Sequence, residues 1–126
     1  MTRDEALKLV KSRVKNKNLV KHMIAVGAAM RSFASFFDGD SEKWELAGIL
    51  HDIDYDKTVN DFPKHGLVSY DELIEIGIDE DIASAVRAHP AHKDFMPKTK
   101  MEWALHIIDP ATGLIVAATL MHPSKK

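Results

Sequence analysis

Residues 41–53 read SEKWELAGILHDI, and this stretch predicts a helix that is apolar on most faces and therefore buried. Trp44, Gly48 and His51 recur at helical spacing, so the histidine should point inward. Asp52 follows directly, offset by about 100° from His51 if the helix continues. The polar stretch 54–63, DYDKTVNDFP, has no helical period and gives the helix a place to end. Both side chains can then converge on one metal ion; a helix-end histidine beside a solvated aspartate is the simpler alternative.

The rest of the chain also carries apolar residues at helical spacing, and strict period-2 alternation is absent. We therefore predict an all-α protein, a compact bundle of about six helices forming a single domain over residues 1–126. Pro110 should interrupt or kink the last helix, because proline lacks a backbone N–H. The other helices are expected over residues 4–15, from a cap at Asn18 to Phe37, from Pro63 to Gly77, over 79–89 and over 100–121, with a loop at 91–98.

The composition limits the classes of function. The 126 residues are 45% hydrophobic and 29% charged, include no cysteine and carry a formal charge of −2. Disulfides and thiolate zinc sites are excluded, and no basic field predicts a nucleic-acid partner. The first residues, MTRDEALKLVKSRVK, lack the apolar segment of a signal peptide. No apolar run reaches the roughly 20 residues that span a bilayer, so we expect a cytoplasmic protein without a membrane partner.

Asp109 is the strongest single indication of a metal site. It is the only charged residue of the segment 107–121, IIDPATGLIVAATLM, which is apolar enough to be buried. Burying an unpaired carboxylate costs several kcal/mol or more, so such a group is normally paired or bound to a metal. No Lys or Arg lies within one helical turn of it. The alternative is that Asp109 caps a helical segment restarting at Pro110.

Three further histidines lie where they can join His51, Asp52 and Asp109. His22 flanks the apolar stripe of the second predicted helix, His65 precedes Gly66 at the start of the fourth, and His89 ends the fifth. Each is a weak candidate by itself, because a half-buried histidine is common.

The order of these residues, H…HD…H…H…D, resembles the ligand order of the HD superfamily of metal-dependent phosphohydrolases. The segments LAGILHDI, KHGLVS, AVRAHP and ALHIIDPATGL resemble the surroundings of its ligands. The resemblance implies an all-helical fold binding one or two divalent ions, with Mn, Fe, Co, Ni, Zn or Mg as candidates. It implies a first metal site made by His22, His51, Asp52 and Asp109, and a second made by His65 and His89 with Asp52 shared.

The resemblance also implies a reaction. Metal-bound hydroxide would attack a phosphoester or phosphoanhydride of a small, nucleotide-type substrate. The segment HDIDYDK departs from the HDIGK of many small members. Lys57 is a candidate substitute for the missing lysine, and Asp56 a candidate water-orienting group or base beside Asp52, or a solvated loop carboxylate. Arg87 or Lys93 could also neutralise developing charge.

Two other functions remain open. One is a di-iron oxygenase built on the same ligand set, and the other is a non-catalytic module that binds metal or nucleotide. The remaining histidines are expected outside the metal sites. His92 belongs to a cationic loop that is solvated or meets substrate phosphate, His106 is expected in the core or at the surface rather than behind a ligand, and His122 lies near the C-terminus.

Overall fold

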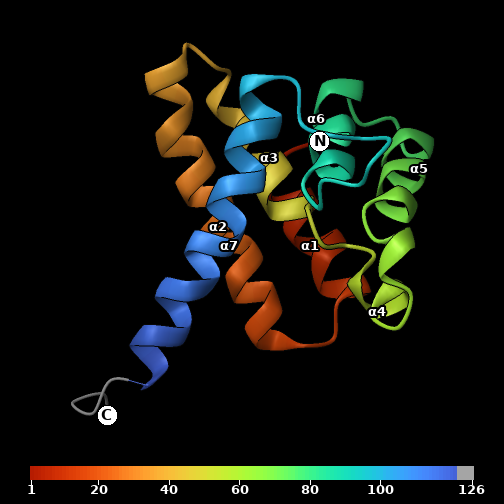
Figure 1. Ribbon diagram of the computed structural model, residues 1–126, viewed down its shortest axis with the longest axis vertical. Coiled ribbons are helices and arrows are strands. Elements are labelled where there is room, and N and C mark those ends of the chain that lie inside the picture. The colour runs from red at the N-terminus through yellow and green to blue at the C-terminus, as the bar shows by residue number, and fades with distance from the viewer. Residues whose placement is uncertain (122–126) are drawn as a thin grey trace.

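The computed structural model describes the backbone of residues 1–121 and the side chains of residues 1–113, so His122 lies outside the described residues. The predicted all-α fold is confirmed, since residues 1–121 form seven α-helices and no strand (Figure 1). The sequence predicts about six helices, and the additional one is the short helix α4, which lies in the stretch expected to be irregular. The helices are α1 (Arg3–Arg13), α2 (Lys17–Ala34), α3 (Ser41–Leu50), α4 (Tyr55–Thr58), α5 (Leu67–Glu75), α6 (Glu80–Ala88) and α7 (Lys100–Met121), with 3₁₀ turns at Ser35–Phe37 and Phe62–Lys64.

The central helix is α3, as the apolar stretch predicts. Every residue from Trp44 to Leu50 is buried, and the Asp40 side chain caps the first turn by accepting from two backbone N–H groups. The helix ends at Leu50, earlier than the sequence indicates, and His51 occupies the C-cap position. Asp52 is therefore outside the helix and free to turn toward the side of His51.

α2 and α3 cross at two glycines. A Cβ atom added to Gly48 would lie 2.6 Å from Cα of Gly27, which is far closer than real Cβ contacts. The two backbones can touch here only because neither residue has a side chain. This close approach places His22 on α2 and His51 at the end of α3 within reach of each other. Their ring centroids are 5.5 Å apart.

Two predicted boundaries are wrong for local reasons, and Pro110 does not interrupt the last helix. Asn16 rather than Asn18 caps α2, with its Oδ1 accepting from the backbone of Asn18 and Leu19. Pro63 lies inside the 3₁₀ turn Phe62–Lys64 and does not start the fourth predicted helix, which is α5 and begins only at Leu67. α7 runs without interruption through Pro110, whose missing N–H removes one backbone bond of a helix held by its packing.

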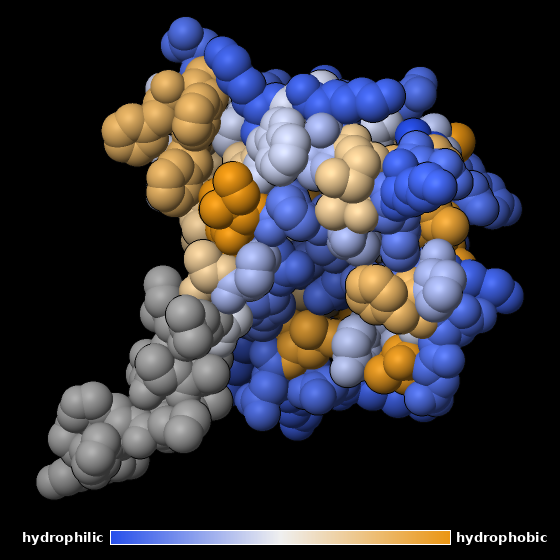
Figure 2. Space-filling view, viewed as in Figure 1, coloured by the Kyte–Doolittle hydropathy of each residue, from blue (hydrophilic) through white to orange (hydrophobic). Residues whose placement is uncertain are grey.

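α7 brings Asp109 to the cluster by packing against α2, α3 and α6, and in Figure 1 it lies across α2. On the outer surface, apolar side chains gather over the C-terminal end of α2, at the upper left of Figure 2. They include Phe33, Phe36 and Phe37, each exposed, with Phe37 stacked on Trp44. Within the described part of the chain, no helix has the length and apolar character needed to cross a membrane.

Candidate metal centre

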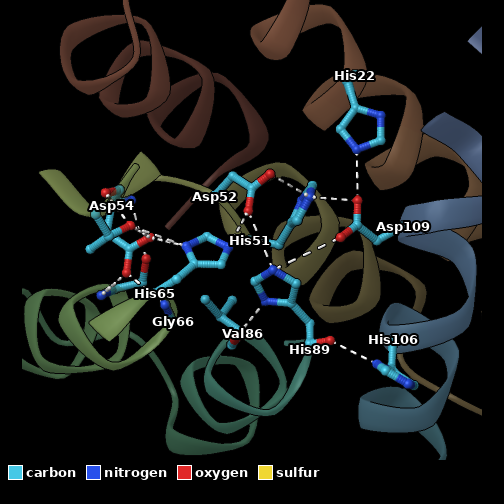
Figure 3. A network of polar contacts seen from close by, with 12 residues as sticks. His22, His51, Asp52, Asp54, His65, Gly66, Val86, His89, His106 and Asp109 are labelled. Carbon is cyan, nitrogen blue, oxygen red and sulfur yellow. Dashed lines mark hydrogen bonds and ion pairs between the residues drawn. The ribbon is translucent and has the colours of Figure 1, made fainter. Parts of the chain in front are cut away.

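Four imidazoles and two carboxylates converge between α2, α3, α6 and α7 (Figure 3). They come from five separate segments, three of which lie next to a helix end and two of which lie within a helix. They are His22 from α2, His51 and Asp52 after α3, His65 before α5, His89 after α6 and Asp109 from α7.

Asp109 lies at the centre of the first group. Its Oδ1 is 2.7 Å from Nε2 of His22 and 3.2 Å from Nε2 of His51. The same His51 nitrogen is 3.2 Å from Oδ2 of Asp52. The alternative in which Asp109 caps a restarting helix is wrong, because α7 is continuous there and the carboxylate contacts histidines instead.

Asp52 joins the first group to a second. Its other oxygen, Oδ1, lies 2.9 Å from Nε2 of His65 and 3.3 Å from Nε2 of His89. Each oxygen of this carboxylate thus faces a different group. Asp52 therefore belongs to both groups, and each of the two groups could hold a metal ion.

The hydrogen bonds behind the rings fix which nitrogen faces the carboxylates. Nδ1 of His51 lies 2.6 Å from the carbonyl oxygen of Gly48, and Nδ1 of His89 lies 2.5 Å from that of Val86. A carbonyl oxygen only accepts, so both Nδ1 atoms carry the hydrogen. In the neutral rings the Nε2 lone pairs then face carboxylate oxygens, which are also acceptors. Only a cation between them, a proton or a metal ion, makes this arrangement favourable.

The donor set fits a metal ion. The donor atoms of each group, one from each residue, all lie within 4.8 Å of one another. Imidazole and carboxylate ligands bind transition metals at about 2.0–2.2 Å, so donors on opposite sides of an ion are about 4 Å apart. Nitrogen and oxygen donors without thiolate suit Mn, Fe, Co, Ni or Zn. The two groups are therefore the right size and chemistry for one ion each.

In the protein without metal, protons hold the first group together. Burial alone lowers the pKa of His51, but the charge of Asp52 and the hydrogen bond to Asp109 raise that pKa well above 6.5. Burial raises the pKa of Asp52, yet the surrounding histidines hold it well below 3.8. Burial opposes ionisation of Asp109 too, and bonds from His22 and His51 still hold its pKa below the usual value.

The two histidines of the second group differ. Burial lowers the pKa of His65, but its bonds to Asp52 and Asp54 outweigh that effect and raise the pKa to about 9. For His89, which is almost fully buried, burial prevails and its pKa is lowered. In the metal-free protein the proton of this group therefore resides on His65.

Asp54 is a residue of the centre that the sequence does not reveal. Its side chain is fully buried, and Oδ1 lies 2.8 Å from Nδ1 of His65. Its Oδ2 accepts from the backbone N–H groups of Gly66 at 2.7 Å and Ser69 at 3.0 Å. In the sequence it is one of several acidic residues in a polar loop, and only the packing of α5 shows that it is buried.

His92 and His106 also support the centre, contrary to expectation. Nε2 of His92 donates to the carbonyl oxygen of His65 at 2.6 Å, so this ring holds the backbone of a candidate ligand rather than being solvated. Nδ1 of His106 donates to the carbonyl oxygen of His89 at 2.8 Å. That contact puts His106 behind a candidate ligand, His89, which is the alternative that the sequence did not favour.

The structure does not bring the other predicted charged residues to the cluster. Asp56 is exposed and accepts from the backbone N–H of Lys15. Lys57 pairs with Glu72 at 2.8 Å, away from the cluster. The guanidinium of Arg87 lies between two aromatic rings, 3.8 Å from the centroid of Tyr70 and 4.1 Å from that of Phe95. Lys93 is exposed in its loop.

A hollow of about 240 Å³ opens onto the centre. Asp52, His65 and Asp109 form part of its wall. The rim is apolar and aromatic, with Phe62 61% and Val59 52% exposed. Tyr55 and Thr58 complete the lining, which contains no lysine or arginine among the described residues. Any negative charge of a ligand in this hollow thus faces the candidate metal sites rather than basic side chains.

Comparison with known proteins gives consistent results. Residues 19–118 match the family model of the HD domain. The chain is 30% identical over 98 residues to ribonuclease Y of Nitratidesulfovibrio vulgaris, in strains DP4 and Hildenborough. That match covers 78% of this chain but only 18% of those relatives, so the chain spans less than a fifth of their length. A predicted HD superfamily hydrolase from an uncultured Thermotogales bacterium has a similar fold, with a TM-score of 0.73, 19% identity, and 96% of this chain and 75% of that chain covered.

Proposed function

Because this chain belongs to the HD-domain family, we propose that it is a metal-dependent hydrolase that cleaves a phosphoester or phosphoanhydride of a nucleotide-type substrate. The single observation that carries the proposal is that Nε2 of His51 lies 3.2 Å from an oxygen of each of two carboxylates, while its Nδ1 donates to the carbonyl oxygen of Gly48. Such a group of acceptors requires a cation, and a buried cluster of this kind in a hollow is a candidate active site.

The proposed ligands divide into two sites. His22, His51, Asp52 and Asp109 would hold the first divalent ion, and His65 and His89 would hold the second with Asp52 shared. When bound, a metal ion with an open position lowers the pKa of a coordinated water to about 7 and so supplies a hydroxide nucleophile at neutral pH. The chain's own contribution is orientation: the backbone carbonyls of Gly48 and Val86 fix the tautomers of His51 and His89.

The lining of the hollow supports a substrate class. The lining has no lysine or arginine among the described residues, and its one histidine, His65, is a proposed metal ligand, so the phosphate would be neutralised chiefly by metal. This favours a substrate with one phosphoryl group at the centre over a polyphosphate, which needs several cationic partners. The exposed ring of Phe62 lies 5.9 Å from that of His65 and offers a face on which an aromatic group can stack.

A second candidate is cleavage of RNA. It is favoured by the sequence identity to ribonuclease Y, whose name states an RNA substrate. The net charge of −2 favours a small substrate over a polynucleotide, because nucleic-acid binding normally needs a basic surface. A direct comparison of substrates separates the two.

The test is hydrolysis by the purified protein, reconstituted with Mn²⁺, of 4-nitrophenyl phosphate, nucleoside monophosphates and a short oligoribonucleotide. The proposal expects turnover of the monoesters that is abolished in Asp52→Ala and retained in Asp71→Ala, which removes an exposed carboxylate on α5. Cleavage of the oligoribonucleotide alone would select the second candidate. Metal binding without turnover of any substrate, or equal turnover in wild type and Asp52→Ala, would contradict both.

A further inference from the structure

Asp54 is a buried charged residue that the proposed reaction does not use. It is 0% exposed, and among the described residues no lysine or arginine pairs with it. Its partners are the His65 ring, the Thr58 hydroxyl and two backbone N–H groups. Burying a carboxylate without a cation nearby is costly. The cation that Asp54 can contact is the His65 ring itself when protonated, and when that ring binds a metal ion the positive charge lies on the far side of the ring.

Among the three candidate ligand rings whose Nδ1 is hydrogen-bonded, His65 alone has a charged partner. Behind His51 and His89 lie neutral backbone carbonyls, whereas Oδ1 of Asp54 lies 2.8 Å from Nδ1 of His65. Nε2 of the same ring faces Oδ1 of Asp52 at 2.9 Å. An imidazole that donates to a carboxylate is a more basic metal ligand than one that donates to a carbonyl.

The two groups also differ in charge. The first contains two carboxylates, Asp52 and Asp109, whereas the second contains only Asp52, which it shares. Asp54 supplies the missing negative charge one imidazole away from the second group. This charge compensates for the smaller number of anionic ligands around a second divalent ion.

We propose that Asp54 is the positioning residue of the second metal site, where its carboxylate orients His65 and supplies the charge that allows a second divalent ion to bind. The inference rests on the proposed function only in taking this cluster to bind metal. Asp54 acts through His65 and does not itself touch the metal or the substrate. Its Oδ2 meanwhile fixes the start of α5, where Gly66 adopts a φ of +85°.

A purely structural role is the competing explanation, because Asp54 also binds the backbone of Gly66 and Ser69. Asp54→Asn keeps an oxygen that can accept from these N–H groups but removes the negative charge. Ser69→Ala is the matched control. It removes a hydroxyl that accepts from the backbone N–H of Asp54 at 3.2 Å and leaves the contact to His65 in place.

The experiment is titration of the metal-free full chain with Mn²⁺, with stoichiometry measured by calorimetry and magnetic coupling between the ions by electron paramagnetic resonance. Wild type and Ser69→Ala should bind two coupled ions. Asp54→Asn should keep the first ion and bind the second about 10- to 100-fold more weakly, with loss of the coupling signal. In a His65→Gln background, Asp54→Asn should weaken the second site no further.

Two unchanged affinities in Asp54→Asn, or equal losses in Asp54→Asn and Ser69→Ala, would overturn the inference. A wild type that binds one ion would overturn it while leaving the first site intact, whereas a wild type that binds none would contradict the proposed function itself. If Asp54→Asn does not fold, ¹⁵N-edited NMR of the Zn²⁺-loaded wild type tests the inference through the chemical shifts of the histidine Nδ1 protons. The proton on Nδ1 of His65 should resonate further downfield than those of His51 and His89, and equal shifts would overturn the inference.

Discussion

Nε2 of His51 lies 3.2 Å from Oδ1 of Asp109, although 58 residues separate the two along the chain. Nδ1 of His51 already donates to the carbonyl oxygen of Gly48. If the His51 ring is neutral, its Nε2 is therefore an acceptor, and this contact would join two acceptors. Helices α3 and α7 thus bring two acceptors together, an arrangement that is favourable only with a cation between them.

Asp52 and Asp109 should differ in how many metal ions depend on them. Since each oxygen of Asp52 faces a different group, Asp52→Ala should lose both ions, whereas Asp109→Ala should lose the first and keep the second. Metal content after reconstitution and desalting, measured by mass spectrometry, checks this. Equal stoichiometry in the two variants would show that Asp52 is not shared.

The metal-free protein should have a characteristic dependence of stability on pH. The pKa of Asp52 lies well below 3.8 in the folded protein, so its contribution is present above 3.8 and lost as the pH falls. The pKa of His65 is raised from 6.5 to about 9, so its contribution is full below 6.5 and lost as the pH rises through about 9. The pKa of His89 is lowered from 6.5, so protonation of this residue favours the unfolded chain, and its contribution to stability rises with pH near and below 6.5.

Urea unfolding in a chelator should therefore show stability falling between pH 6.5 and about 9. With Mn²⁺ present, stability should instead rise over that window, because metal ligands must be deprotonated. If stability depends on pH in the same way with and without Mn²⁺, no metal ion replaces the protons bound at the cluster.

The crossing of α2 and α3 should be sensitive to a single methyl group. Gly48→Ala places a Cβ 2.6 Å from the backbone of Gly27, so the helices must separate and the protein should lose about 1–3 kcal/mol of stability. Gly113→Ala is the control, since among the described residues its Cβ would meet only Cε1 of His22, at 3.7 Å. That variant should be neutral or up to about 1 kcal/mol more stable, because alanine favours helix. Denaturant unfolding compares the two.

Phe62 should contribute to binding of aromatic substrates. Phe62→Ala should raise KM for an aryl phosphate roughly 2- to 10-fold, which corresponds to about 0.5–1.5 kcal/mol of ring–ring contact. KM for an alkyl phosphate should change little. Phe36→Ala removes an even more exposed ring that does not line the hollow, and it serves as the control. Equal effects on both substrates would exclude stacking as the role of Phe62.

The sequence is sufficient for the helical fold and the candidate ligands because their signals are local. His51 ends an apolar helix and is fully buried, as the sequence predicts. Asp109 is the one charge in an apolar segment, but the predicted burial of that segment is wrong in part, because the Asp109 side chain is 24% exposed and Ile107 is 60% exposed. Asp54 could not be recognised, because its burial depends on how the start of α5 packs against it. His106 could not either, since its role is a bond to a backbone carbonyl on another helix.

Local chemistry also left some boundaries undetermined. Asn16 and Asn18 are equally good caps, and only the backbone conformation at Asn16 decides between them. The backbone bond lost at Pro110 is outweighed by the packing of α7 against three other helices, which the local sequence does not encode.

Anomalous scattering from crystals grown with Mn²⁺ is the most direct test of the metal centre. We predict a strong peak about 2.2 Å from Nε2 of His51 and a carboxylate oxygen of Asp109, and a second peak beside Nε2 of His65 and His89, both within bonding distance of Asp52. A map without a peak at this cluster, under conditions that load Mn²⁺ elsewhere, would contradict it.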